Sequence, residues 1–437
     1  MDLQVHNVAI AALEPRPTNP RTHSKKQIKQ IADSIREFGF VNPVLIDGEG
    51  RIIAGHGRVE AAKLLGLTEA PAVRVDHLSD AQIRAYVIAD NKLALNAGWD
   101  EGLLRLELKE LSVNLDFDLT LTGFETAEID QLLIGGEVDE ADEFEAPDHS
   151  RPAVSRVGDL WRIGCHRVLC ADATKPGSYA RLLGGLRAQL VFTDPPYNVP
   201  IKGHVSGLGR ARHEEFAMAS GEMSQAEFTA FLRTIFTNLA SYSADGSVHY
   251  ICMDWRHMRE VLEAAKGAYS ELLNLCVWTK TNGGMGSFYR SQHELVFVYQ
   301  NGRGSHVNNV ELGRHGRYRT NVWQYPGVNT FGASRDADLA MHPTVKPVAL
   351  VADAIKDASK RNAIVLDAFG GSGTTLVAAE QTGRRGFALE ISPHYVDTIV
   401  KRISEATGER ATLEGTGETF SAVRDWRASG LDEEVFA

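Results

Sequence analysis

The first part of the chain alternates between helical and strand-like spacing of its apolar residues. Isoleucines recur at the period of one helix face between Ser24, a candidate N-cap, and Gly39, a helix stop signal. Two short apolar runs, at 43–46 and 51–53, predict strands joined by an Asp-Gly-Glu-Gly turn. A second helix is expected over 59–65, directly after a glycine-containing turn of the kind that binds anions.

The second part carries longer apolar runs that predict buried strands. These runs occupy 189–192, 364–366 and 386–389, and a helix is predicted over 374–381. The order between 364 and 381 is strand, glycine-rich turn, helix. Because glycine has no side chain to collide with a ligand, such a turn allows a close approach to the backbone.

The glycine-rich turn departs from two common phosphate-binding motifs. Leu376 stands where a dinucleotide-binding fingerprint has its third glycine, and Thr374 stands where a P-loop has lysine. Glu390 lies 20 residues after Gly370, the spacing of an acid that binds a ribose hydroxyl. We therefore expect a ligand that contains adenosine and ribose, with no requirement for a phosphate.

Charge is distributed unevenly along the 437 residues. Residues 137–150 carry seven acids and no Lys or Arg, which predicts a solvated linker between two domains. The net charge of −11 argues weakly against a nucleic-acid partner, but residues 301–335 contain five arginines against a single acid. Arginines interleaved with aromatic residues in that segment suit contacts to phosphates and bases.

Composition excludes several other classes of protein. At 43% hydrophobic residues the chain has a globular composition, and its apolar runs fall far short of the roughly 20 residues that span a bilayer. We expect no signal peptide. The four cysteines form no CxxC pair, and Cys165, His166 and Cys170 supply too few ligands for zinc. We predict reduced cytosolic thiols and no metal site.

The sequence FTDPPYNVP, at 192–200, combines an acid, a rigid backbone and an aromatic ring. An exocyclic amine of a base is a poor nucleophile because its lone pair is delocalised into the ring. A carboxylate at Asp194 and the carbonyl of Pro195, held by Pro196, accept its two hydrogens and favour a tetrahedral nitrogen that attacks a methyl group. Tyr197 offers a stacking face worth about 1–3 kcal/mol, which offsets part of the cost of flipping a base out of a duplex.

Residues 158–406 resemble the DNA amino-methyltransferases of the N4/N6 family. Asp194 precedes Gly370 by 176 residues, an order that matches the beta class of this family, in which the target-recognition region lies between the two motifs. The sequence HPTVKP at 342–347 is similar to an element of that class that helps bind S-adenosylmethionine. The resemblance implies a Rossmann-like α/β fold and S-adenosylmethionine as cofactor.

The resemblance also assigns roles residue by residue. Cofactor-binding residues are expected at Asp172, Pro343, Thr344, Lys346, Asp367, Phe369, Gly370, Gly371, Gly373, Thr374 and Glu390. For Asp172, an ordinary surface turn is the alternative. DNA-binding residues are expected in a target-recognition region at about 303–335, at Arg303, Arg314, Arg317 and Arg319.

The first 136 residues are similar to the N-terminal domain of the ParB/sulfiredoxin family. The similarity rests on the sequence NPR at 19–21, on IIAGHGRVEAAKLLG at 52–66, and on DNKLALNAGWD at 90–100. ParB proteins carry an Arg-rich element that holds a nucleotide triphosphate, but here Gly57 and Glu60 stand where arginines are expected. We therefore predict weak or no nucleotide binding.

The sequence thus predicts an α+β ParB/sulfiredoxin-like domain at 1–136, an acidic linker at 137–150 and a methyltransferase domain at 151–437. The expected reaction is methyl transfer to the N6 amine of adenine in double-stranded DNA. N4-cytosine methylation, transfer to a protein glutamine amide and a non-catalytic ParB-like DNA-binding protein are the alternatives. We therefore expect a cytoplasmic protein of bacterial or phage origin that does not associate with a membrane. The interpretation leaves open whether the protein forms a homodimer and whether it has a separate restriction enzyme as partner.

Overall fold

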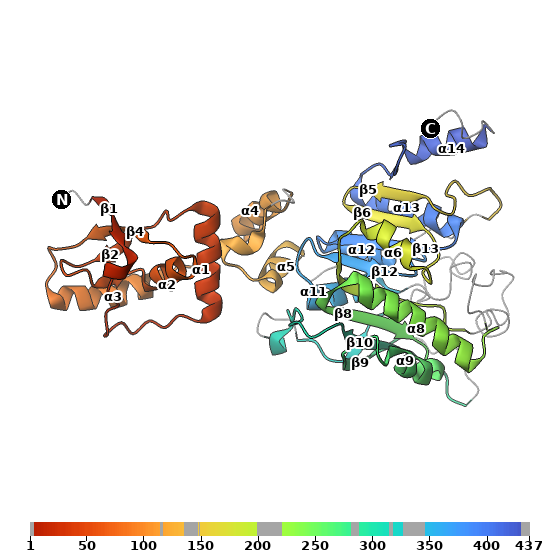
Figure 1. Cartoon of the computed structure of the whole chain (residues 1–437), viewed down its shortest axis with the longest axis horizontal. Helices are drawn as coiled ribbons and strands as arrows, with labels where there is room; N and C mark the ends of the chain where they lie inside the picture. Colours follow the sequence, from red (N-terminus) through yellow and green to blue (C-terminus); the bar gives the residue numbers. More distant parts are fainter. Residues whose placement is uncertain are drawn as a thin grey trace. The chain divides into compact units, whose positions relative to one another are not determined.

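The computed structural model describes residues 4–113, 117–134, 147, 149–198, 221–280, 288–313, 318–326 and 346–429. The chain divides into two compact units, Met1–Leu133 and Ile134–Ala437. Both are drawn in Figure 1. The predicted linker at 137–150 lies almost entirely outside the described residues. None of the helices in the described part of the chain combines the length and apolar character of a membrane span.

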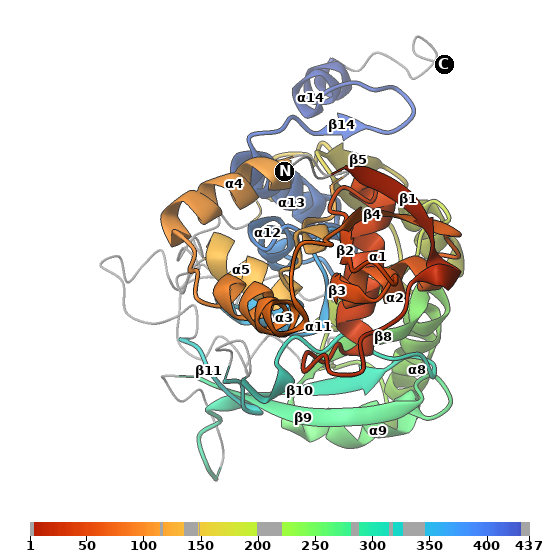
Figure 2. The ribbon, with the colours of Figure 1, turned by 90° about the vertical axis from the view of Figure 1, so that its left-hand side faces the viewer.

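The first unit contains a four-stranded sheet in the order β1-β4-β2-β3 and five α-helices among its described residues. The strands are β1 (Val5–Ala9), β2 (Val44–Ile46), β3 (Ile52–Ala54) and β4 (Glu69–Arg74). The helices are α1 (Lys25–Phe38), α2 (His56–Leu64), α3 (Asp80–Ala94), α4 (Glu101–Val113) and α5 (Thr126–Ile134). Figure 2 shows α1 and α2 side by side.

The predicted elements of this unit are confirmed, with small shifts. The Ser24 hydroxyl accepts a hydrogen bond from the Gln27 amide at 3.1 Å, and Gly39 ends α1 with a φ of 80°. Helix α2 begins at His56, three residues earlier than expected, because Gly55 adopts a left-handed conformation and serves as its N-cap.

The second unit is built on a ten-stranded sheet, as far as the described residues show, in the order β11-β9-β10-β8-β7-β12-β13-β6-β5-β14. The strands are β5 (Leu160–Ile163), β6 (His166–Cys170), β7 (Ala188–Thr193), β8 (Ser243–Met253), β9 (Glu271–Thr279), β10 (His293–Gln300), β11 (Val322–Gln324), β12 (Ile364–Asp367), β13 (Arg385–Glu390) and β14 (Thr412–Leu413). The helices are α6 (Pro176–Leu183), α8 (Gln225–Tyr242), α9 (Met258–Ala265), α11 (Val348–Ala358), α12 (Thr374–Gln381), α13 (Pro393–Thr407) and α14 (Phe420–Ala428).

Helices cover both faces of this sheet, which is why its central strands are continuously apolar. Leu190 and Val365 belong to a core shared with α11, α12 and α13. Their chain neighbours Val191 and Leu366 belong to a second core, shared with α6, α8 and α9. The α/β class predicted from the sequence is confirmed.

The strand directions bring the sequence motifs to one edge of the sheet. Strands β6, β13, β12, β7 and β8 are mutually parallel, so their carboxyl ends meet at the same edge. The DPPY sequence follows β7 there, and the glycine-rich turn follows β12. Because β10 is antiparallel to β8, it begins at this edge and ends at the opposite one. We call the edge at which the parallel strands end the carboxyl edge.

Candidate active site at the carboxyl edge of the large sheet

Asp194 directly follows β7, and its carboxylate is held from two sides. Oδ2 lies 2.5 Å from the Lys346 ammonium, and Oδ1 accepts a hydrogen bond of 2.6 Å from the Tyr197 hydroxyl. The side chain is 21% exposed, so it is not sealed off from solvent. The three side chains come from two distant segments, and the sheet brings them together.

Glu294, near the start of β10, is a member of this site that the sequence analysis missed. It lies 2.5 Å from the Lys280 ammonium, 3.0 Å from the Lys346 ammonium and 3.1 Å from the Tyr197 hydroxyl. Its side chain is 11% exposed. A signal was present, because Glu294 is the one acid at the start of an otherwise apolar run, Leu295–Tyr299.

The two carboxyl groups are electrostatically different. Burial raises the pKa of Asp194, and Lys346 only partly offsets this effect. Burial also disfavours ionised Glu294, but Lys346 and Lys280 together lower its pKa to about 2. Burial would lower the pKa of Lys346, yet the two carboxylates raise it above its ordinary value. Glu294 and Lys346 therefore form an ion pair, whereas burial and the neighbouring Glu294 carboxylate oppose the ionisation of Asp194.

Asp367, at the end of β12, joins the glycine-rich turn to the strand that carries DPPY. One oxygen accepts hydrogen bonds from the Thr193 hydroxyl at 2.8 Å and the Phe369 amide at 3.0 Å, and the other accepts from Thr375 at 2.6 Å. Burial raises the pKa of Asp367 to about 7. These bonds engage both oxygens, so this geometry makes Asp367 a support of the turn.

The glycine-rich turn leaves open space at Gly371. Gly371 and Gly373 have φ values of 51° and 84°, which other residues rarely adopt. A Cβ on Gly371 would meet nothing closer than 3.8 Å, whereas one on Gly370 would lie 2.9 Å from Ile399. The Glu390 carboxylate accepts hydrogen bonds from the amides of Gly371, at 2.9 Å, and Ser392, at 2.8 Å. This geometry is compatible with the adenosine-containing ligand that the sequence predicts, and the contacts of these residues with the cofactor stay a prediction.

Comparison with known proteins identifies the parts of the chain. The family model of N6/N4 DNA methylases matches residues 188–401, the ParB N-terminal domain matches 2–91, and the helix-turn-helix domain of ParB-methyltransferases matches 102–157. The chain is a DNA methyltransferase of the N6/N4 family with a ParB-type N-terminal part. The predicted fusion is confirmed.

Individual relatives match different parts of this methyltransferase. A ParB-like nuclease domain-containing protein, YnaK of Escherichia coli (strain K12), is 50% identical over 70 residues, which are 16% of this chain and 80% of YnaK. YubD of the same organism, described as a methylase, is 28% identical over 262 residues, 60% of this chain and 94% of YubD. Among solved structures, the M1.HpyAVI–SAM complex has a TM-score of 0.41 at 19% identity and covers 54% of this chain and 98% of its own.

Asp172 follows β6 at the carboxyl edge of the methyltransferase, as expected for the end of a parallel strand. Its carboxylate accepts hydrogen bonds of 2.7 Å from both the amide and the hydroxyl of Thr174. This is the geometry of a capped turn. The predicted contact with the cofactor stays a prediction. Pro343, Thr344, Arg314 and Arg317 lie outside the described residues.

Arg319 has a different role from the predicted DNA contact. Its guanidinium lies 3.0 Å from Asp357 and 3.4 Å from Asp353, both on α11, and donates a hydrogen bond of 2.8 Å to the Tyr325 hydroxyl. The side chain is 18% exposed. Arg319 therefore attaches the segment around β11 to α11, and the DNA contact expected at this residue stays a prediction.

Arg303 is exposed, but it lies at the opposite edge of the sheet. It follows the end of β10, where Gln300 pairs with Val248, and its amide donates a hydrogen bond of 2.8 Å to Asp245 near the start of β8. The DNA contact expected at Arg303 stays a prediction. Sequence spacing places Arg303 next to the recognition segment, whereas the antiparallel direction of β10 places it at the far edge.

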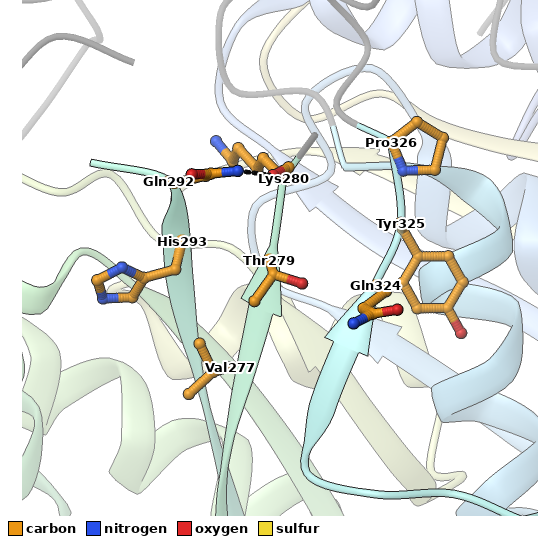
Figure 3. A pocket seen from close by; sticks show the side chains of 8 residues that line it. All are labelled: Val277, Thr279, Lys280, Gln292, His293, Gln324, Tyr325 and Pro326. Carbon is orange, nitrogen blue, oxygen red and sulfur yellow. Dashed lines mark hydrogen bonds between the residues drawn. The ribbon is translucent and has the colours of Figure 1, made fainter. Parts of the chain in front are cut away.

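A cavity of about 670 Å³ opens beside the site, between the ends of β9, β10 and β11 (Figure 3). It is lined by Val277, Thr279, Lys280, Gln292, His293, Gln324, Tyr325 and Pro326. Gln292 donates a hydrogen bond of 2.9 Å to the Lys280 carbonyl, which fixes the rim at the start of β10. The amides, the hydroxyl and the imidazole of this lining are suited to hydrogen bonds with bases.

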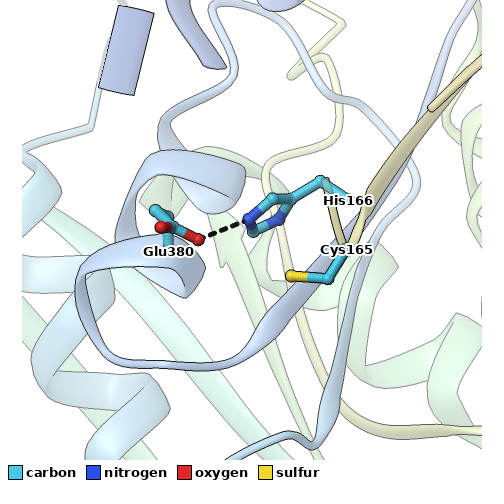
Figure 4. Close-up of side chains that lie close together, drawn as sticks. All are labelled: Cys165, His166 and Glu380. Carbon is cyan, nitrogen blue, oxygen red and sulfur yellow. Dashed lines mark hydrogen bonds and ion pairs between the residues drawn. The ribbon is translucent and has the colours of Figure 1, made fainter. Parts of the chain in front are cut away.

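Cys165, His166 and Glu380 form the group with metal-ligand chemistry in the described part of the chain (Figure 4). Nδ1 of His166 accepts a hydrogen bond of 2.9 Å from the Gly386 amide, which assigns the proton of the neutral ring to Nε2. Nε2 then donates to Glu380 at 2.8 Å. Both ring nitrogens are engaged, so His166 joins β6 to α12 and β13 and is poorly suited to hold a metal ion.

Proposed function

We propose that this methyltransferase modifies the N6 amine of adenine in double-stranded DNA. Asp194 and the carbonyl of Pro195 accept the two amine hydrogens, and the ring of Tyr197 stacks on the flipped base. The observation that carries the proposal is the position of the partly exposed Asp194 side chain at the carboxyl edge, beside the turn that follows β12. The motif begins with Asp, which supports adenine as the target base, because the cytosine-specific enzymes of the N4/N6 family more often have Ser at this position.

The residues of the glycine-rich turn fit S-adenosylmethionine, the methyl donor of this family. Gly371 leaves open space beside the turn, and Glu390 is available to accept hydrogen bonds from ribose hydroxyls. When bound, this cofactor supplies an electrophilic sulfonium methyl group. Thr193 and Asp367 hold the turn against the strand that carries Asp194, so donor and acceptor sites keep a fixed separation.

N4-cytosine methylation is the second candidate, because the same pair of acceptors fits the exocyclic amine of cytosine. The experiment is to incubate the full chain with duplex DNA and labelled S-adenosylmethionine, and to identify the modified nucleoside by mass spectrometry. We expect N6-methyladenine. Detection of N4-methylcytosine alone would replace the proposal by the second candidate, and absence of label in the wild type and Asp194→Ala alike would contradict both.

A further inference from the structure

Lys346 contacts Asp194 and Tyr197, the residues proposed to bind the target base, although the sequence resemblance assigns it to the cofactor. Its ammonium is 2.5 Å from Asp194 Oδ2, 3.0 Å from Glu294 Oε2 and 3.1 Å from the Tyr197 hydroxyl. The side chain is 5% exposed. A buried cation is stable only beside its counter-ions. The two carboxylates therefore hold the Lys346 ammonium in this position.

The ammonium makes the same kind of contact that a target amine would make. Both groups present N–H donors to a carboxylate oxygen, and Asp194 Oδ1 already accepts from Tyr197. Lys346 therefore shares or yields Oδ2 when the base enters. Glu294 Oε2 gives the ammonium a second acceptor within reach, so that it keeps a charge partner throughout.

We propose that Lys346 and Glu294 are positioning residues for the Asp194 carboxylate. Lys346 keeps the carboxylate ionised and oriented while the base site is empty, and Glu294 takes the ammonium when the target amine replaces it. This inference rests on the proposed function, in which Asp194 accepts a hydrogen bond from an exocyclic amine. It does not depend on whether that amine belongs to adenine or cytosine.

The charges around Asp194 give the pair a testable signature. The titratable groups that face Asp194 among the described residues are Lys346, Glu294, Tyr197, Asp367 on β12 and Cys252 on β8. Lys346 stabilises the charged carboxylate, whereas Glu294 destabilises it. Removing the lysine and removing the acid must therefore change the pH at which Asp194 ionises in opposite directions.

The experiment measures single-turnover methylation of duplex DNA by the full chain from about pH 5 to about pH 9, with saturating cofactor. In Lys346→Gln we expect a rate at least about 10-fold lower near neutral pH, with the acid limb moved upward by about 1–3 pH units. In Glu294→Gln the acid limb moves downward. Lys280→Gln is the matched control, because Lys280 contacts Glu294 from the other side, and its acid limb should move little.

Calorimetry of cofactor binding distinguishes a positioning role of Lys346 from a role in binding S-adenosylmethionine. We expect all three variants to bind S-adenosylmethionine within a few-fold of the wild type. A loss of affinity in Lys346→Gln as large as its loss of rate would overturn the inference, and so would acid limbs that do not move or that move in the same direction.

Two further observations keep the test decisive. If Lys346→Gln fails to fold, Lys346→Arg, which keeps the charge, should retain the wild-type acid limb while Glu294→Gln shifts it, and equal profiles would overturn the inference. A wild type that produces N4-methylcytosine contradicts only the proposed base. A wild type that methylates adenine without the opposite shifts contradicts only the positioning pair.

Discussion

The Thr193 hydroxyl donates a hydrogen bond of 2.8 Å to the Asp367 carboxylate and accepts one of 3.2 Å from the Ala368 amide. Thr193 ends β7, immediately before Asp194, and Asp367 ends β12, immediately before the glycine-rich turn. Because Thr193 is 1% exposed, water cannot reach its hydroxyl. These two hydrogen bonds therefore satisfy polar groups that would otherwise be buried without a partner. One buried side chain therefore fixes the base site relative to the cofactor turn.

Replacing Thr193 with Val should weaken both stability and cofactor binding. The change leaves the Ala368 amide and an oxygen of Asp367 short of a partner, which costs about 2 kcal/mol of unfolding free energy. Chemical denaturation and calorimetry with S-adenosylmethionine measure the two effects. Thr234→Val is the control, because the exposed Thr234 hydroxyl donates only to the Ala230 carbonyl on its own helix, and should change stability by less than about 0.5 kcal/mol. Equal effects in both variants would contradict the special role of Thr193.

Glu390 should make cofactor affinity depend on pH. Burial raises the pKa of Glu390, an effect that the amides of Ser392 and Gly371 partly offset. Only the ionised carboxylate accepts hydrogen bonds with both oxygens, so affinity should fall as the pH falls through this raised pKa. Glu390→Gln should bind about 10- to 100-fold more weakly and lose the pH dependence. Calorimetry at several pH values measures this, and Glu380→Gln, which faces His166, should behave as the wild type.

Replacing Arg319 with Ala should destabilise the protein and leave DNA affinity unchanged. The loss of the guanidinium leaves Asp353 and Asp357 without this partner, which costs about 3 kcal/mol for a largely buried pair. Denaturation and a salt series of DNA binding measure the two properties. The exposed Arg303→Ala serves as the control, with a change of less than about 0.5 kcal/mol. A salt slope reduced by about 1 in Arg319→Ala would restore the phosphate contact.

The ParB-like unit should not bind nucleoside triphosphates tightly. The Arg58 guanidinium lies over its own turn, since a Cβ on Gly55 would be 2.9 Å from its Nη2, and Glu60 pairs with Lys63 at 2.8 Å. Each missing arginine would have supplied charge-assisted hydrogen bonds of about 1.5–3 kcal/mol. Calorimetry of the full chain with CTP and ATP should therefore show no micromolar binding. Micromolar binding that Arg58→Ala abolishes would contradict this account.

The sequence by itself determined the elements that depend on local chemistry. The cap at Ser24, the stop at Gly39 and the buried strands before DPPY and before the glycine-rich turn follow from side-chain and backbone preferences over a few residues. The meeting of those two motifs was also predictable through the family resemblance, because the carboxyl ends of parallel strands share one edge.

Only the tertiary structure decided which charges face one another. Glu294 reaches Lys346 and Tyr197 because β10 runs antiparallel to β8, and the same direction takes Arg303 to the opposite edge. Arg319 finds its counter-ions in two acids on α11. A sequence shows that a charge is present, but its counter-ion is chosen by strand direction and helix packing over distances of tens to hundreds of residues, and there local preference carries no information.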